Sequence, residues 1–313
     1  MISLRHHVIS LAAVFLALAI GMILGSGLFS DTMVTGLRGD KGDLQGEVRT
    51  LQDQKTALQD KLTAADQFDA QMSGRIVRDA LAGKSVVLFR TPDAADEDVE
   101  ATTRLIDRAG GRVSGTIALT EEFVAGDSAD KLSSVVNSPI LPAGAQLGAA
   151  TDPGTQAGDL IGIALLADRA PAAVPVDDDA RATVLTALRD TGFVAYDPGG
   201  QLGPADTAVI ITGGALPADA GNRGLTVARF AAGLAPHGAG TVLAGRDGSA
   251  TGISAVAVAR SEPATAEAVT TVDDIGAESG RITAVLALQA MIAGVPPGRY
   301  GVGAGAVSVT VPQ

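Results

Sequence analysis

Residues 84–119 read KSVVLFRTPDAADEDVEATTRLIDRAGGRVSGTIAL, and this stretch indicates the fold. It begins with the apolar run Val86–Phe89, which is short and rich in β-branched residues and therefore predicts a buried strand. Residues 94–109 carry apolar side chains at helical spacing, and a glycine pair ends that helix. Residues 113–119 then return to the pattern of a strand. Two strands joined by a helix favour a parallel pair.

The same alternation recurs further along the chain. Helices are predicted at 177–191, 225–235 and 279–293, and strands at 193–196, 207–212, 241–244, 253–258 and 307–311. Strands that alternate with helices are typical of a mostly parallel sheet with helices on both faces. We therefore expect an α/β domain over residues 84–313, with a helical, loop-rich insertion at 128–170.

An uncharged apolar segment precedes this domain. Residues 8–29, VISLAAVFLALAIGMILGSGLF, would extend roughly 33 Å as a helix, enough to cross a hydrocarbon core of about 30 Å. A buried core helix and a signal peptide cleaved near the small residues 25–27 are the alternatives. Arg5 precedes the segment and Asp31 is the first charge after it, which favours residues 1–7 in the cytoplasm. The prediction is a single-pass protein of the cytoplasmic (inner) membrane with an extracytoplasmic C-terminal domain.

Heptad spacing follows the apolar segment. After a linker at 30–36, leucines recur every seven residues within 37–80 and predict a two-stranded coiled coil. Within the apolar segment, small residues recur every four positions on one face, a spacing that lets membrane helices approach closely. We expect a parallel homodimer; a single amphipathic helix lying on its own domain is the alternative. The expected dimer interface consists of Gly21, Gly25, Leu44, Val48, Leu51, Leu58 and Leu62.

Composition removes several classes of function. The chain of 313 residues has a formal net charge of −12, which argues against nucleic acid as a partner. It has no cysteine, so disulfides, Cys-based metal sites and thiol catalysis are excluded. Aromatic residues make up only 3% of the chain, so aromatic platforms for sugars or bases are not expected.

Few side chains fit a catalytic pattern. Ser128 and Lys131 have the Ser-x-x-Lys spacing of penicillin-recognising enzymes, but no Lys-Thr-Gly follows. His237 is the one histidine outside the N-terminal apolar part, and no Gly-x-Ser-x-Gly elbow accompanies it. An exposed turn is the simpler interpretation of His237. No catalytic residue is therefore predicted.

Candidate ligand sites are also sparse. The Gly-x-Gly-x-Gly pattern at 301–305 resembles a dinucleotide-binding loop, yet a predicted strand follows where a phosphate-binding helix is needed. The acidic clusters 177–179 and 273–274 suit helix capping better than a hard cation.

Soft metals would have to bind thioether or imidazole ligands in this chain. After the apolar segment the inventory is Met33, Met72, Met291 and His237, which make a poor copper site. No cofactor is predicted, and the metal ligands stay undetermined.

Several short segments resemble a known protein family. They are MISLRHH at 1–7, LGSG at 24–27, VDD at 272–274, SGR at 279–281 and GRYG at 298–301. On these residues the chain resembles the actinobacterial copper-transport protein family MctB. The resemblance covers nearly the whole chain and implies copper homeostasis or transport across the cell envelope.

For SteB-like members of that family, the resemblance implies a different role. The chain would be a non-enzymatic dimeric scaffold or regulator of cell-wall hydrolysis and cell separation, acting with a second envelope membrane protein. An anchor, a coiled-coil spacer and a domain without catalytic residues suit this alternative. An enzyme, which would need a pocket with convergent polar groups, is the third hypothesis.

Overall fold

The computed structural model describes residues 4–25, 30–167, 176–197, 199–200 and 202–312. The chain divides into two compact units, Met1–Ala65 and Asp66–Gln313.

The first unit is helical. Helix α1 (Leu4–Gly25) is apolar on all sides from Val8 onward, and its residues 6–23 are long and apolar enough to cross a membrane. Helix α2 (Ser30–Ile76) has 47 residues, or about 70 Å at 1.5 Å per residue. It therefore includes residues 30–36, where a linker was predicted, because the segment has no proline and each glycine costs a helix only about 1 kcal/mol.

The last turns of α2 and the residues after it belong to the second unit. The predicted coiled coil extended to residue 80, but Val77 and Leu81 are fully buried in the core of the α/β domain. The heptad pattern thus continues into a segment whose apolar side chains have partners within the chain. Before Asp66 the described apolar side chains of the heptad pattern are exposed, and after it Phe68 and Ile76 also stay exposed, at 63% and 46%.

The second unit is built on a seven-stranded sheet with the order β3-β2-β1-β4-β5-β6-β7. Six strands are parallel, and β3, at one edge, pairs antiparallel with β2. The strands are β1 (Ser85–Arg90), β2 (Arg112–Leu119), β3 (Val194–Ala195), β4 (Thr207–Ile211), β5 (Thr241–Ala244), β6 (Thr270–Val272) and β7 (Arg299–Tyr300). The predicted α/β fold with a mostly parallel sheet is confirmed.

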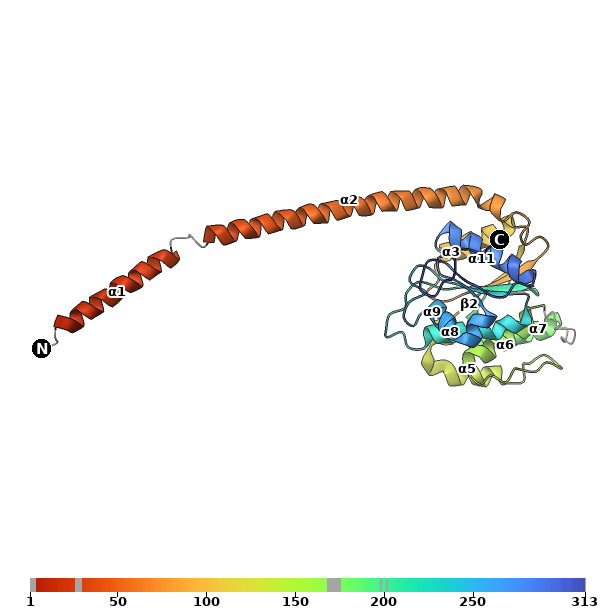
Figure 1. The fold of residues 1–313 in the computed structure, drawn as a ribbon. Helices are drawn as coiled ribbons and strands as arrows, with labels where there is room; N and C mark the ends of the chain where they lie inside the picture. The colour runs from red at the N-terminus through yellow and green to blue at the C-terminus, as the bar shows by residue number, and fades with distance from the viewer. Residues whose placement is uncertain (1–3, 26–29, 168–175, 198, 201, 313) are drawn as a thin grey trace. The chain divides into compact units, whose positions relative to one another are not determined.

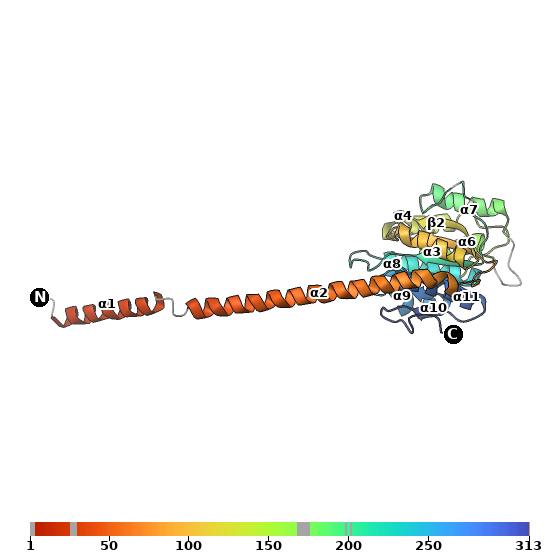
Figure 2. The ribbon, with the colours of Figure 1, turned by 90° about the horizontal axis from the view of Figure 1, so that it is seen from above.

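Helices cover both faces of the sheet (Figures 1 and 2). On β1, Val86 and Leu88 point into one hydrophobic cluster, while Val87 and Phe89 point into the other, as the two-residue period of a strand requires. The first cluster packs under α3 (Asp96–Arg108) and α11 (Glu278–Ile292). The second packs under α4 (Glu121–Val124), α5 (Ala129–Val136), α6 (Pro153–Leu165), α7 (Asp178–Asp190), α8 (Arg223–Leu234) and α9 (Ala255–Ser261).

Helices α6 and α8 pack against each other with their backbones in contact. The segment 128–170 contains α5 and α6, so it contributes directly to this helical layer. Gly158 on α6 lies against the carbonyl oxygen of Phe230, and Gly233 on α8 lies against that of Thr155. The Phe230 ring then makes edge-to-face contacts with Phe89 and Phe123, at centroid distances of 5.2 and 5.3 Å.

A methyl group at this crossing is expected to destabilise the domain. In Gly158→Ala, the new Cβ would overlap the Phe230 carbonyl oxygen, so the two helices must separate. We expect a loss of about 3 kcal/mol in the free energy of unfolding, measured by urea denaturation. Gly126→Ala is the matched control because nothing lies within 4 Å of a Cβ there. Equal stability of the two variants would contradict the packing.

Two predicted strands were wrong. Residues 255–258 of the predicted strand 253–258 belong to α9, in which Ala255, Val256 and Ala259 are buried with helical spacing. Residues 307–311 touch β7 through one bridge, Tyr300 to Ser308, because β7 offers only two residues for pairing. Strand β6 was not predicted, and its three residues are too few for a periodic pattern.

Candidate functional site

The strand order reverses between β1 and β4, which is where doubly wound folds bind ligands. In this chain the carboxylate of Asp93, just after β1, occupies the position. It accepts hydrogen bonds from Thr91 Oγ1 at 2.5 Å and from Gly213 N at 3.1 Å. A Cβ on Gly213 would overlap this carboxylate. The remaining cavity is about 20 Å³, which holds no more than a water molecule.

A second carboxylate occupies the glycine-rich loop after β7. Asp273 Oδ1 accepts hydrogen bonds from Val302 N at 2.8 Å and Gly303 N at 3.1 Å. Gly301 has φ +124°, a backbone conformation that favours glycine, and a Cβ there would overlap the carboxylate. Arg260 Nη1 lies 2.6 Å from Asp273 Oδ2, and both side chains are buried. The loop that resembles a dinucleotide-binding loop thus holds an internal anion.

Charged side chains join α2, α3 and α11 near their ends. Asp98 is 1% exposed and lies 2.5 Å from Arg246 Nε and 3.6 Å from Arg281 Nη1. Arg281 also pairs with Glu278 at 3.0 Å, and Asp66 on α2 accepts a hydrogen bond from Glu278 N at 2.7 Å. The hydrogen bond to Asp98 is the main reason that the pKa of Arg246 is raised. The network holds helices together and has no free nucleophile.

Asp274 is a partly buried carboxyl group that forms no ion pair among the described residues. Burial, and then the charge of neighbouring Asp273, raise the pKa of Asp274 to about 6. Its Oδ1 is buried without a hydrogen-bond partner among the described residues. The carboxyl is therefore more easily protonated in the folded chain than in the unfolded chain.

This shift predicts a pH dependence of stability. The folded state holds the Asp274 proton up to about pH 6, whereas the unfolded chain loses it near pH 4, so stability falls as pH rises between these values. Asp274→Asn is expected to remove this loss. At pH 7 the gain should be about 1–2 kcal/mol, less than the full shift implies because the carboxyl is partly exposed to water. Urea unfolding of both chains at pH 5 and 7.5 measures it; a variant with the wild-type pH dependence would contradict the argument.

His237 lies in the short 3-10 helix η2 (Ala235–His237) and is not an exposed turn as predicted. Its ring packs against Gly162 on α6, and its Nε2 lies 2.5 Å from Asp159 Oδ1. Both side chains are only 14% exposed. Since Asp159 also accepts a hydrogen bond from Gly148 N, the pair ties a loop and η2 to α6.

The other sequence candidates also have structural partners. Lys131 Nζ lies 2.9 Å from Glu122 and 5.1 Å from the centre of the Phe193 ring, and its hydrogen bond lowers the pKa of Glu122. Lys131 is thus committed away from the role of a base for Ser128. Asp177 accepts a hydrogen bond from Ala180 N and caps α7, as predicted for the first acidic cluster.

Comparisons with known proteins identify the family. The family model described as "Copper transport outer membrane protein, MctB" matches residues 1–311. Proteins named "Copper transporter MctB" from Mycobacterium tuberculosis and Mycobacterium bovis are each 58% identical over 314 residues, covering all of both chains. The Mycobacterium leprae protein of that name is 59% identical over 317 residues, again over all of both chains. The chain belongs to the MctB family.

The soft-metal candidates of this MctB-family chain lie on separate elements. Met72 is on α2, Met291 on α11 and His237 on η2, and the side chain of Met33 lies outside the described part. Met291 Sδ accepts a hydrogen bond from Thr270 Oγ1 at 3.3 Å in the core. Within the ranges the structure describes, no three His, Asp or Glu side chains are grouped to hold a metal ion.

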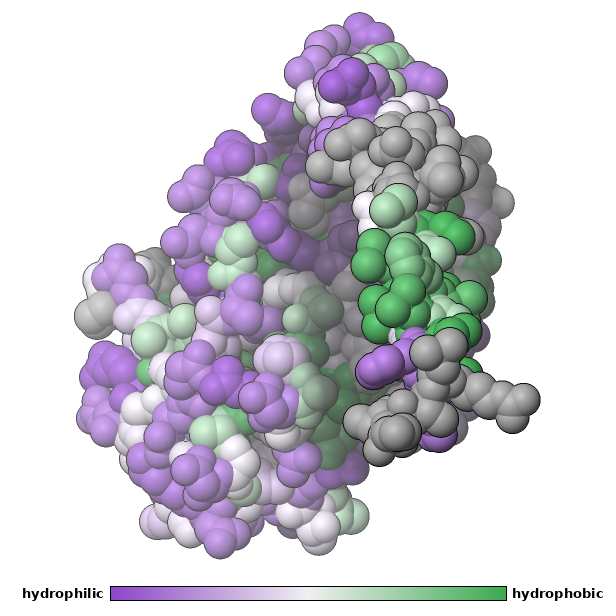
Figure 3. Space-filling view, turned by 90° about the vertical axis from the view of Figure 1, so that its left-hand side faces the viewer, coloured by the Kyte–Doolittle hydropathy of each residue, from purple (hydrophilic) through white to green (hydrophobic). Residues whose placement is uncertain are grey.

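The predicted dimer residues of this MctB-family chain lie on two helix faces. On α1, a Cβ added at Gly21 or Gly25 would meet nothing within 4 Å. The apolar side chains of α1 make a continuous hydrophobic surface, green in Figure 3. Among the described residues, α1 is the one helix that passes the length and composition test for a membrane span, consistent with a single membrane anchor.

Helix α2 carries the other five predicted dimer residues. Their exposed fractions are large for apolar side chains: Leu44 65%, Val48 49%, Leu51 56%, Leu58 65% and Leu62 70%. These five residues form what is called here the α2 stripe. Apolar side chains exposed in a row on one helix are a feature of surfaces that bind another helix or a membrane.

Proposed function

We propose that this chain acts in copper homeostasis at the cell envelope, as a non-enzymatic protein anchored in the cytoplasmic membrane. The observation that carries the proposal is identity of 58–59% over the full length with proteins named copper transporter MctB. The charge before α1 and the acidic residue after it support an N-terminus in the cytoplasm and an extracytoplasmic α/β domain. Asp93 and Asp273 fill the two positions, called here the anion cradles, at which backbone N–H groups could hold an anionic ligand. This supports a role other than catalysis on a bound anion.

A deletion strain tests the copper role. At a fixed external copper concentration, loss of the chain is expected to change the copper content of the cells several-fold, and the wild-type gene should restore it. Zinc content of the same cells is the control. Unchanged copper content and copper tolerance would overturn the proposal. A titration of the purified full chain with Cu(I) and Cu(II) under chelator competition then shows whether copper contacts this chain directly.

The second candidate function is a dimeric scaffold that acts with another envelope membrane protein. The α2 stripe favours it, because its leucines repeat every seven residues and stay half or more exposed in the single chain. In a parallel pair, Leu44, Leu51 and Leu58 would meet their own copies at d positions, with Val48 and Leu62 at a positions. Lysine at the intervening a position, Lys55, favours two strands over three or four.

The absence of native cysteine makes the pairing directly testable. In a parallel, in-register dimer, the Cβ atoms of two d residues come within disulfide distance. Leu51→Cys in membranes is therefore expected to give a disulfide-linked dimer on a non-reducing gel. Asp53→Cys, on the outer face of the same turn, is the matched control and should stay monomeric. Equal cross-linking of the two variants, or none, would contradict the parallel dimer.

A further inference from the structure

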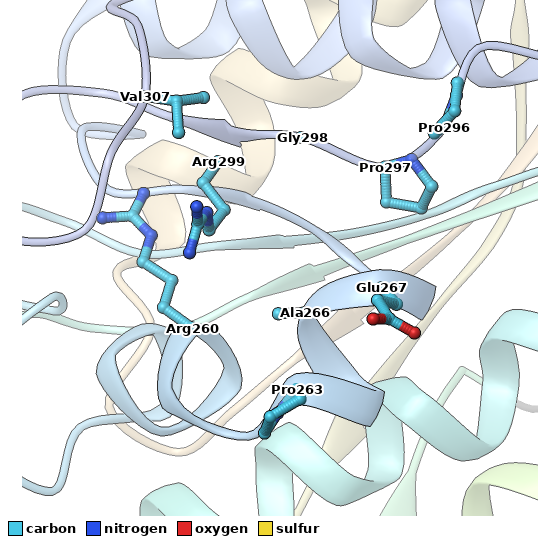
Figure 4. Close-up of a pocket in the computed structure, with 9 residues that line it drawn as sticks. All are labelled: Arg260, Pro263, Ala266, Glu267, Pro296, Pro297, Gly298, Arg299 and Val307. Carbon is cyan, nitrogen blue, oxygen red and sulfur yellow. The ribbon is translucent and has the colours of Figure 1, made fainter.

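A pocket of about 510 Å³ lies beside β7, at the edge of the sheet opposite β3. This is within the size range of small-molecule sites. Helix α10 (Pro263–Ala268) forms one wall, and residues 296–299 with Val307 form the other (Figure 4). Three of the nine lining residues are prolines, whose fixed φ angles give the walls little freedom to lose on binding.

Two arginines line this pocket, and they differ in the contacts that their guanidinium groups make within the chain. Arg260 donates through Nε to Thr271 Oγ1 at 3.0 Å, through Nη1 to Asp273 at 2.6 Å and through Nη2 to the Tyr300 carbonyl at 2.7 Å. It is therefore fixed by the protein. Arg299, in contrast, has no carboxylate within ion-pair distance in the part of the chain that the structure describes.

That makes Arg299 different from the other arginines of the domain. Among the described side chains, each other arginine that is partly or fully buried pairs with an aspartate or glutamate. These are Arg90, Arg181, Arg189, Arg223, Arg229, Arg246, Arg260 and Arg281. Because no carboxylate of the described chain holds the Arg299 guanidinium, an anionic ligand could pair with it without breaking an existing ion pair.

The opposite side of the pocket has the reverse charge. Glu267 on α10 lies on the other side of Ala266 from Arg299 in Figure 4, and Pro297 adds apolar surface on the wall above Glu267. A phosphate, with close to two negative charges, would be attracted to one side and repelled by the other. A molecule that carries one carboxylate and one ammonium group would be attracted to both.

We propose that this pocket binds a small zwitterion of the size of an amino acid or a dipeptide. Arg299 would hold its carboxylate through paired N–H donors, Glu267 would accept hydrogen bonds from its ammonium group, and a small aliphatic side chain would lie on the proline walls. The site is separate from the copper proposal and does not depend on it.

Calorimetry on the full chain in detergent tests the site with four probes. These are alanyl-alanine, its N-acetyl derivative, its C-terminal amide and inorganic phosphate. Alanyl-alanine is expected to bind with a Kd of about 1 mM or below. Either capped form should bind about tenfold more weakly, because each lacks one of the two charges. Phosphate that binds more tightly than alanyl-alanine, or no heat from alanyl-alanine up to about 10 mM, would overturn the proposal.

Three variants locate the binding. Arg299→Gln is expected to weaken alanyl-alanine binding about tenfold or more and to leave the amide form unchanged. Arg299→Lys keeps the charge but loses the bidentate geometry, so it should fall in between. Arg112→Gln removes an exposed arginine from β2, far along the sheet, and should bind as the wild type does. Wild-type affinity in Arg299→Gln would place the ligand elsewhere and overturn the assignment.

Discussion

Replacing Asp273 with alanine is expected to lower the free energy of unfolding by about 3–5 kcal/mol. The reason is the charge left behind. Arg260 is 4% exposed in its side chain, and its Nη1 would lose the carboxylate 2.6 Å away that compensates for its burial. The amide groups of Val302 and Gly303 would also lose their acceptor. Urea unfolding of the full chain, followed by circular dichroism, measures the change.

The control for this prediction is Asp247→Ala, which removes an exposed aspartate from the loop after β5. It should lie within about 0.5 kcal/mol of the wild type. A further comparison isolates the charge. The double variant Arg260→Leu, Asp273→Leu leaves no unpaired charge and should be more stable than Asp273→Ala alone. If Asp273→Ala lost less than about 1 kcal/mol, Arg260 would have another counter-charge and the buried-pair interpretation would be wrong.

The second large effect is expected on the α2 stripe. Leu51→Asp together with Leu58→Asp would place like charges opposite each other at two d positions of the proposed dimer, where burial is also lost. The dimer should dissociate, and if the chain functions as a dimer, copper content in a complemented deletion strain should stay at the deletion level. The domain itself should keep its stability, because both residues precede Asp66 and are more than half exposed.

Asp53→Asn together with Asp60→Asn changes two charges on the outer face of the same turns and serves as the control. It should support a dimer and wild-type copper content. If the Leu51→Asp, Leu58→Asp chain were monomeric and still restored copper content fully, the copper role would not require dimerisation through the α2 stripe. The change must not extend past residue 65, because Asp66 caps α11 and Val77 packs in the domain core.

Periodic segments could be predicted from the sequence, and short edge elements could not. The helices expected at 94–109 and 279–293 are α3 and α11 within two residues at their ends, since each has a glycine stop and a continuous apolar face. Residues 253–258 alternate apolar residues with alanine and serine, which fits a strand and a buried helix equally well. Packing against β5 and β6 stabilises the helical conformation of this segment.

The candidate sites show the same division. By sequence, the pattern at 301–305 predicts no phosphate site because no phosphate-binding helix follows it, yet the loop does surround an anion, since closely spaced glycines allow backbone N–H groups to converge. That the anion is Asp273 depends on the pairing of β6 with β7, which no local pattern contains. Asp93 gave no signal at all, since its partner Gly213 N lies 120 residues away.

The two carboxylates inside the anion cradles act as tethered ligands. A group attached to the chain and already oriented is present at an effective concentration far above the millimolar levels of free metabolites. Dissolved anions therefore do not displace Asp93 or Asp273, and the concentration of free anions does not affect the domain through these two positions. The pocket at Arg299 has no such built-in competitor. If a dissolved small molecule binds this domain, the proposed place is therefore the pocket at the edge of the sheet, and not the switch point between β1 and β4.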